Sequence, residues 1–268
     1  LAIEAICTRA GLPGGVLRTV LAEPAAVAAL IADPRVRAIS LTGSSRAGKQ
    51  VGALAGAALK PCTFELGGSD PYLVLADADV AHAAKTCATA RPINGGQSCI
   101  SAKRMIVVES VREEFERRLV SEFAQRRQGD PTREDTDVGP MARSDLRREL
   151  HAQVTASVRA GARLLVGGRV PAGPGFHYPP TVLSGVTTGM PAHDQELFGP
   201  VASIIPVPDL EAAITVANTS PFGLGAAIFT RNRRLGETIA REQLDVGMVC
   251  INDFIRSDPT LPFGGVKE

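Results

Sequence analysis

Short apolar runs alternate with amphipathic helical patterns along most of the chain. Apolar residues recur every three or four positions in segments such as 111–123 and 146–158, which is the spacing of one helix face. Short apolar runs bounded by Gly, Pro, Asp or Asn are typical of buried strands. These patterns predict strands at 36–41, 62–66, 72–75, 105–108, 163–166, 181–183, 201–207, 225–230 and 247–252, and helices at 1–10, 23–32, 49–59, 80–90, 111–123, 146–161, 210–217 and 233–243. Strands and helices alternate, which predicts an α/β fold with a largely parallel sheet.

Two helix starts carry capping signals. Asp77 and Asp79 precede the helix predicted at 80–90, and a carboxylate there can accept hydrogen bonds from free backbone N–H groups. Ser110 is followed three residues later by Glu113, which is the spacing of a capping box. We therefore expect the next helix to begin directly after Ser110.

The composition narrows the function classes. The 268 residues suffice for one large domain or two smaller ones, and a net charge of +1 with dispersed basic residues gives no nucleic-acid footprint. No apolar run reaches the roughly 18 residues of a membrane span. The five cysteines are scattered and lack C-x-x-C spacing, and the four histidines are dispersed. This pattern indicates neither a disulfide framework nor a metal site. We expect a cytoplasmic protein with no membrane or nucleic-acid partner.

One loop carries candidate nucleophilic chemistry. In residues 94–104 (NGGQSCISAKR), Cys99 follows a double-glycine turn and precedes Lys103 and Arg104. Cations near a thiol favour the thiolate, which is the nucleophilic form. From the local sequence alone, a buried and inert thiol is an equally good interpretation.

A second pattern indicates an anion site. The strand predicted at 36–41 runs into Thr42-Gly43-Ser44-Ser45-Arg46-Ala47-Gly48 and then into a helix. Strand, glycine turn and helix aim free backbone N–H groups at an anion such as a phosphate. The segment lacks the G-x-G-x-x-G spacing, so an ordinary strand–helix turn stays open as the alternative.

Three separated motifs and the end of the chain then carry a family resemblance. They are residues 64–68 (FELGG), 96–99 (GQSC), 196–200 (ELFGP) and 261–267 (LPFGGVK). In this order they resemble the aldehyde dehydrogenase superfamily over essentially the whole chain. The closest resemblance is to the NAD(P)-dependent succinate-semialdehyde dehydrogenases.

The resemblance implies a fold and two catalytic residues. It implies a three-layer α/β catalytic domain at 67–268 and part of a Rossmann-like dinucleotide-binding domain at 1–66. Cys99 matches the family's nucleophile, and Glu65 matches the general base that activates the deacylating water. A working nucleophile should have a pKa below the roughly 8.5 of a free thiol, so we expect a lowered pKa for Cys99.

It also implies a cofactor, a substrate and an assembly. The cofactor would be NAD or NADP, the substrate a small-molecule semialdehyde, and the assembly a homodimer or homotetramer. The matching cofactor positions are Gly43, Ser44, Gly48, Leu66, Glu196 and Phe198. Phe263 matches a substrate-pocket aromatic, and Arg256 and Ser257 lie in the loop before it, where an Arg could pair with a substrate carboxylate; an exposed loop Arg is the alternative.

The family's chain extends further at both ends. By resemblance, this sequence is a C-terminal part that lacks half of the cofactor domain and the final oligomerisation segment. Two other hypotheses therefore stay open beside a dehydrogenase. One is a truncated, non-catalytic product, and the other is a Cys/Glu hydrolase that uses no nucleotide.

Overall fold

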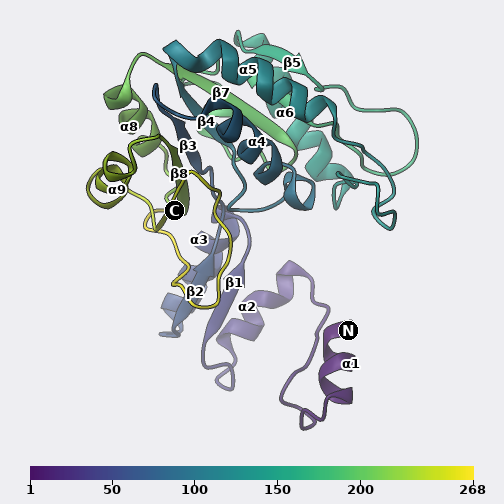
Figure 1. Cartoon of the computed structure of the whole chain (residues 1–268). Helices are drawn as coiled ribbons and strands as arrows, with labels where there is room; N and C mark the ends of the chain where they lie inside the picture. Colours follow the sequence, from purple (N-terminus) through teal and green to yellow (C-terminus); the bar gives the residue numbers. More distant parts are fainter. The chain divides into compact units, whose positions relative to one another are not determined.

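The chain folds into two compact units. The computed structural model describes all residues, Leu1–Glu268, and divides them into Leu1–Leu66 and Gly67–Glu268 (Figure 1). The family resemblance implies a domain boundary at the same point. That the first unit binds a dinucleotide and the second is catalytic stays a prediction.

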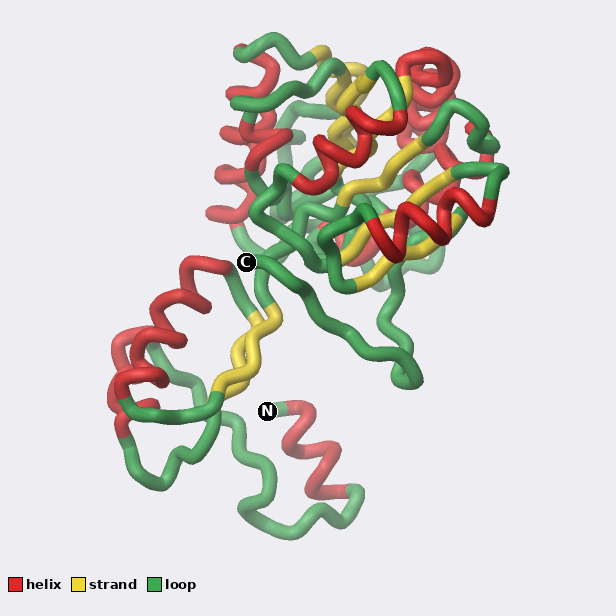
Figure 2. The backbone as a smooth tube through the Cα atoms, turned by 90° about the vertical axis from the view of Figure 1, so that its left-hand side faces the viewer, coloured by secondary structure: helices red, strands yellow, loops and turns green.

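The first unit is a small parallel sheet with helices. Its elements are α1 (Ala2–Arg9), α2 (Pro24–Ala32), β1 (Ile39–Thr42), α3 (Ser45–Ala57) and β2 (Cys62–Glu65). The two strands pair in parallel, with Thr42 opposite Glu65, and appear as the separate yellow pair in Figure 2. Only Ile31, Gly48 and Ala55 are buried in this unit, so its apolar core is minimal.

The second unit is built on a seven-stranded sheet. Its strands are β3 (Pro71–Val74), β4 (Arg104–Val108), β5 (Arg163–Val166), β6 (Thr181–Ser184), β7 (Val201–Val207), β8 (Gly225–Phe229) and β9 (Met248–Ile251), in the order β5-β6-β7-β4-β3-β8-β9. Every pair is parallel except the antiparallel β5–β6 pair at one edge. The predicted α/β fold with a largely parallel sheet is therefore confirmed.

Helices cover both faces of this sheet. They are α4 (Val80–Ala90), α5 (Glu109–Ala124), α6 (Ser144–Arg159), α7 (Pro191–Asp194), α8 (Leu210–Asn218) and α9 (Arg233–Glu242). Successive strand residues point to opposite faces, so Tyr72 packs with α4 and α5, while Leu73 packs with α6, α8 and α9. The unit thus has three layers, with a buried apolar core on each side of the sheet.

Some helix boundaries differ from the sequence predictions. Asp79 caps α4 as predicted, accepting a hydrogen bond from the His82 N–H at 3.0 Å. The capping-box prediction at Ser110 is wrong: α5 begins at Glu109, and Val108 occupies the N-cap position. Strand β4 runs directly into this helix, which leaves no loop residue to act as a side-chain cap. The short helices η1 (Ile93–Gly96) and α7 were not predicted.

The final segment carries no helix or strand. After β9, residues 252–268 continue to the C-terminus as turns and loop, drawn in yellow in Figure 1. Across the chain, none of the helices combines the length and the apolar character that crossing a membrane demands.

Candidate functional site around Cys99

Strand order brings three loops of the second unit together at the N-terminal ends of the central strands. Gly67 and Gly68 precede β3, Cys99 precedes β4, and Glu196 precedes β7. These three strands are parallel neighbours in the order β7-β4-β3, so their first residues lie side by side at the same end of the sheet. Residues separated by more than a hundred positions therefore form one cluster, which we call the Cys99 site.

Close backbone packing holds this cluster together. A Cβ atom on Gly68 would lie closer than 3.0 Å to the carbonyl oxygen of Cys99, and one on Gly67 would lie 2.6 Å from Glu196 Oε2. Gly96 has a φ of +74°, and a Cβ atom there would lie 2.6 Å from the nitrogen of Pro200. At Gly68 and Gly96 the neighbouring atoms are main chain and cannot move aside, so only glycine fits there. The glycines thus let the three motifs touch.

The buried side chain of Arg91 hydrogen-bonds to two of these loops. It is fully buried at the end of α4 and donates from Nε to the carbonyl of Val201 at 2.6 Å. Its Nη atoms donate to the carbonyls of Gly96, Leu197 and Gly199. One guanidinium therefore fixes the Cys99 loop to the Glu196 loop. No sequence motif marked this residue; a lone Arg before Pro92 gives no such signal.

Lys103 links the Cys99 loop to Glu196. Its side chain is buried, and Nζ donates to the carbonyl oxygens of Ser98 at 2.7 Å and Cys99 at 2.8 Å. The same atom lies 3.2 Å from Glu196 Oε1, which also accepts a hydrogen bond from the Gly68 N–H at 3.1 Å. Glu196 is thus held by a main-chain donor and by a cation.

The electrostatics of the thiol differ from the sequence expectation. Burial raises the pKa of the Cys99 thiol; Lys103 acts in the opposite direction, and the carboxylates of Asp70 and Glu196 add to the rise. The expected lowered pKa is therefore wrong for this structure. Desolvation of the thiolate outweighs the one cation that reaches it.

The second predicted cation points elsewhere. Arg104 donates to the carbonyl of Ser69 at 2.8 Å and to the carbonyls of Val216 and Ala217 in the last turn of α8. Its charge therefore supports a helix C-terminus. Asp70 lies nearby, fully buried, and accepts from the Gly225 N–H at 3.1 Å. Burial raises the pKa of Asp70 to about 6.

The first unit carries its predicted residues at the end of its sheet. Gly43 donates its N–H to the carbonyl of Glu65 at 2.9 Å, and Ser44 caps α3 by accepting from the Ala47 N–H. Glu65 is the last residue of β2 and is half-buried. The Ser45 hydroxyl, which the sequence did not single out, is buried there without a hydrogen-bond partner.

Gly48 lies elsewhere than predicted. It is inside the first turn of α3 rather than in the loop before it, because the helix already begins at Ser45. A Cβ atom on Gly48 would lie 2.6 Å from Leu66 Cδ1. The two predicted cofactor residues Gly48 and Leu66 therefore pack against each other.

The predicted substrate residues lie on the last segment of the chain. Arg256 is exposed, pairs with Asp253 at 3.1 Å and stacks 4.1 Å from the ring centroid of Phe254. Ser257 is also exposed, and Phe263 is half-buried. Phe198, two residues after Glu196, is half-buried as well.

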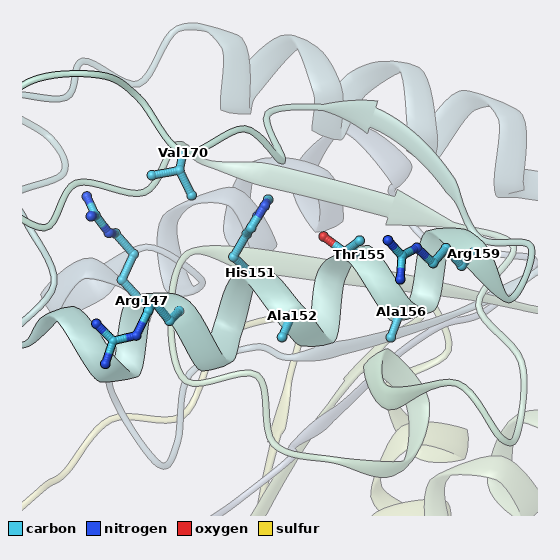
Figure 3. A pocket seen from close by; sticks show the side chains of 8 residues that line it. Arg147, His151, Ala152, Thr155, Ala156, Arg159 and Val170 are labelled. Carbon is cyan, nitrogen blue, oxygen red and sulfur yellow. The ribbon is translucent and has the colours of Figure 1, made fainter.

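A separate cavity lies along the outer side of α6. It measures about 430 Å³, and Figure 3 shows Arg147, His151 and Arg159 along the helix, with Val170 from the connection that follows β5. It is lined by cations and small apolar groups, and none of the predicted residues is among them. Its lining offers no thiol or carboxylate. Groups of three or more potential metal ligands are absent from the chain.

Comparisons with known proteins cover the whole chain. The aldehyde dehydrogenase family model matches residues 1–268. The NAD(P)+ succinate semialdehyde dehydrogenase Sad of Escherichia coli (strain K12) is 48% identical over 262 residues, which are 97% of this chain and 56% of that protein. The chain therefore spans a little more than half the length of this relative.

Solved structures agree. Succinic semialdehyde dehydrogenase from Streptococcus pyogenes, in complex with NADP+, has a TM-score of 0.95 at 36% identity and covers 99% of this chain and 58% of its own. A Mycobacterium tuberculosis aldehyde dehydrogenase complexed with NAD+ has a TM-score of 0.94 at 34% identity, covering 99% and 55%. Both likenesses extend over the two units described above.

Proposed function

Because the chain belongs to the aldehyde dehydrogenase family, we propose that the protein oxidises a semialdehyde to the carboxylic acid with NAD+ or NADP+. Succinate semialdehyde is the substrate we favour, since relatives at 44–48% identity are named for it. The observation that carries the proposal is the convergence of Cys99, Glu196 and the Gly67–Gly68 turn at the N-terminal ends of the central strands β4, β7 and β3. A homodimer or homotetramer stays a prediction.

Cys99 performs the covalent step in this proposal. Its thiolate attacks the aldehyde carbon and forms a thiohemiacetal, and the Cys99 backbone N–H is a candidate donor to the oxyanion. The cofactor, when bound, supplies the hydride acceptor. Loss of hydride leaves a thioester on Cys99. Glu65 then takes a proton from water, and the resulting hydroxide hydrolyses the thioester and frees the thiol.

The residues present fit a dinucleotide. The Ser45 hydroxyl has no partner and stands in the first turn of α3, where a phosphate would meet free N–H groups and the positive end of the helix dipole. The Glu196 side chain is 18% exposed, so its carboxylate can reach a ribose hydroxyl while Lys103 and Gly68 hold it. Phe198 would lie beside the nicotinamide.

Arg256 is the candidate partner for a substrate carboxylate. Its side chain is 61% exposed, and it already has an anionic partner in Asp253. A substrate carboxylate would therefore compete with Asp253 for the guanidinium. Ser257 would supply a neutral hydroxyl donor beside it, and Phe263 an apolar wall.

The test is absorbance of NADH or NADPH during turnover of succinate semialdehyde by the full-length protein. Cys99→Ala should abolish it, while Cys250→Ala, a change at another half-buried thiol, should leave it within about threefold of wild type. Acid formation without an absorbance change would favour the hydrolase hypothesis. A Cys99→Ala protein with an unchanged rate would contradict the proposal.

A further inference from the structure

We propose that Lys103 is a positioning residue that ties the Cys99 loop to the Glu196 carboxylate and sets the charge balance around the thiol. This assignment rests on the proposed role of Cys99 as nucleophile. Lys103 would touch neither substrate nor cofactor and would act through the two residues it holds.

The geometry shows a cation with all its donors used. A lysine ammonium has three N–H donors. Those of Lys103 meet three acceptors: the carbonyl oxygens of Ser98 and Cys99, at 2.7 and 2.8 Å, and Glu196 Oε1 at 3.2 Å. Two acceptors belong to the nucleophile loop and the third precedes β7. One buried group therefore spans both halves of the Cys99 site.

The loop carbonyls explain why a cation is needed here. The turn before Cys99 places Asn94, Gly95 and Gly96 at positive φ, so ordinary helical hydrogen bonding stops there. The carbonyls of Ser98 and Cys99 consequently lie outside a regular helix; the Ser98 carbonyl accepts a turn hydrogen bond from the Ser101 N–H at 3.3 Å, and both carbonyls are open to side-chain donors. Lys103 serves both of them, and the Ser101 hydroxyl gives Ser98 a further donor at 3.3 Å.

Two carboxylates and one cation act on the Cys99 thiol. Glu196 and Asp70 are the carboxylates that act on Lys103, and Arg91 is the other cation that does so. The same two carboxylates and Lys103 act on the Cys99 thiol. Lys103 is therefore the cation that offsets two anions next to the nucleophile. Without it, both carboxylates would oppose formation of the thiolate.

Alkylation of the thiol tests this assignment without cofactor or aldehyde. The rate of iodoacetamide addition to Cys99 is followed against pH by mass spectrometry of the 268-residue chain, with Cys99→Ala as the blank. Lys103→Met, which removes the charge and all donors, should raise the pH midpoint of alkylation by about one unit. Lys103→Gln, which keeps two N–H donors, should raise it also. Lys85→Met, at an exposed lysine of α4, should leave it unchanged.

Glu196→Gln should lower the midpoint of alkylation. It removes a carboxylate that opposes thiolate formation, and the charge of Lys103 is then no longer offset by an ion pair with Glu196. Thermal unfolding shows which variants fold. A folded Lys103→Met or Lys103→Gln chain with the wild-type midpoint would overturn the proposal. Should neither fold, a Glu196→Gln midpoint at or above the wild-type value would overturn it.

The two proposals can fail separately. Loss of NADH formation in Cys99→Ala tests the oxidation chemistry, and the alkylation midpoint tests Lys103 alone. A dehydrogenase whose Lys103 variants keep the wild-type midpoint would retain the proposed function and lose this inference. A protein whose Lys103 variants shift the midpoint but which makes no NADH would retain this inference and lose the proposed function.

Discussion

The α-carbon of Gly68 lies so near the main-chain carbonyl of Cys99 that a Cβ atom on Gly68 would stand closer than 3.0 Å to that oxygen. Gly68 begins the approach to β3, and Cys99 precedes the adjacent strand β4. The main-chain carbonyl of Cys99 is therefore packed directly against Gly68. Main-chain atoms cannot swing aside as a flexible side chain would.

Gly68→Ala should consequently destabilise the second unit by about 1–3 kcal/mol, the usual cost of overpacking. Gly264→Ala is the matched control, because a Cβ atom there would meet nothing within 4 Å. We expect it to change the free energy of unfolding by less than about 0.5 kcal/mol. Urea unfolding of both variants measures the difference; equal stabilities would show that the loops do not pack this closely.

Arg91→Met should cost more. It leaves the carbonyls of Gly96, Leu197, Gly199 and Val201 without this buried donor. The carbonyls of Leu197 and Gly199 keep a main-chain donor, whereas those of Gly96 and Val201 lose this one. Each unsatisfied buried acceptor costs about 1–3 kcal/mol, so we expect a loss of at least about 2 kcal/mol in the free energy of unfolding. Arg117→Met, at an exposed position of α5, is the control. Unchanged stability in Arg91→Met would refute the tethering role.

Asp70 should make stability depend on pH. Its pKa is raised by burial to about 6, above the roughly 3.9 of an unfolded chain. The folded state therefore binds the proton more tightly, and the stability this contributes is complete below about pH 4 and lost as pH rises through 6. Asp70→Asn removes the effect. The free energy of unfolding of the variant minus that of wild type should rise by about 2 kcal/mol between pH 4 and pH 7; parallel curves would contradict this.

The first unit should open more readily than the second. Only three of its residues are buried, whereas β3, β4 and β8 are buried along their whole length. Local opening is easiest where few apolar contacts exist. Hydrogen–deuterium exchange followed by mass spectrometry should therefore label Leu1–Leu66 well before those strands. Equal protection of the two units would disprove this expectation.

Periodicity and short motifs were enough to predict much of the fold. The strand at 201–207 coincides with β7, the strand at 105–108 begins one residue after β4, and the strand at 72–75 is shifted by one residue from β3. The capping box at Ser110 failed because a strand leads straight into α5, a tertiary feature that local spacing does not show. Gly48 was placed in a turn although helix α3 had already begun.

The site was less predictable than the fold. Sequence motifs named Cys99, Glu65 and Glu196, yet their spacing could not show that parallel neighbours β3, β4 and β7 bring the Gly68, Cys99 and Glu196 loops together. Ligands of open α/β sheets usually bind at the carboxyl ends of strands, whereas these loops precede the strands. Arg91 and the three-way contact of Lys103 depend on side-chain direction, which only the folded chain reveals.

The central claim is that Cys99 carries the acyl group and Glu65 releases it. Its most direct measurement is a rapid mixing experiment with the full-length Glu65→Gln protein, succinate semialdehyde and NAD+ or NADP+. We predict a burst of about one reduced cofactor per protein, followed by arrest, with an acyl adduct on Cys99 detected by mass spectrometry. Glu211→Gln, at an exposed position of α8, should turn over like wild type. Continued turnover of Glu65→Gln at the wild-type rate, or an adduct on another residue, would contradict the account.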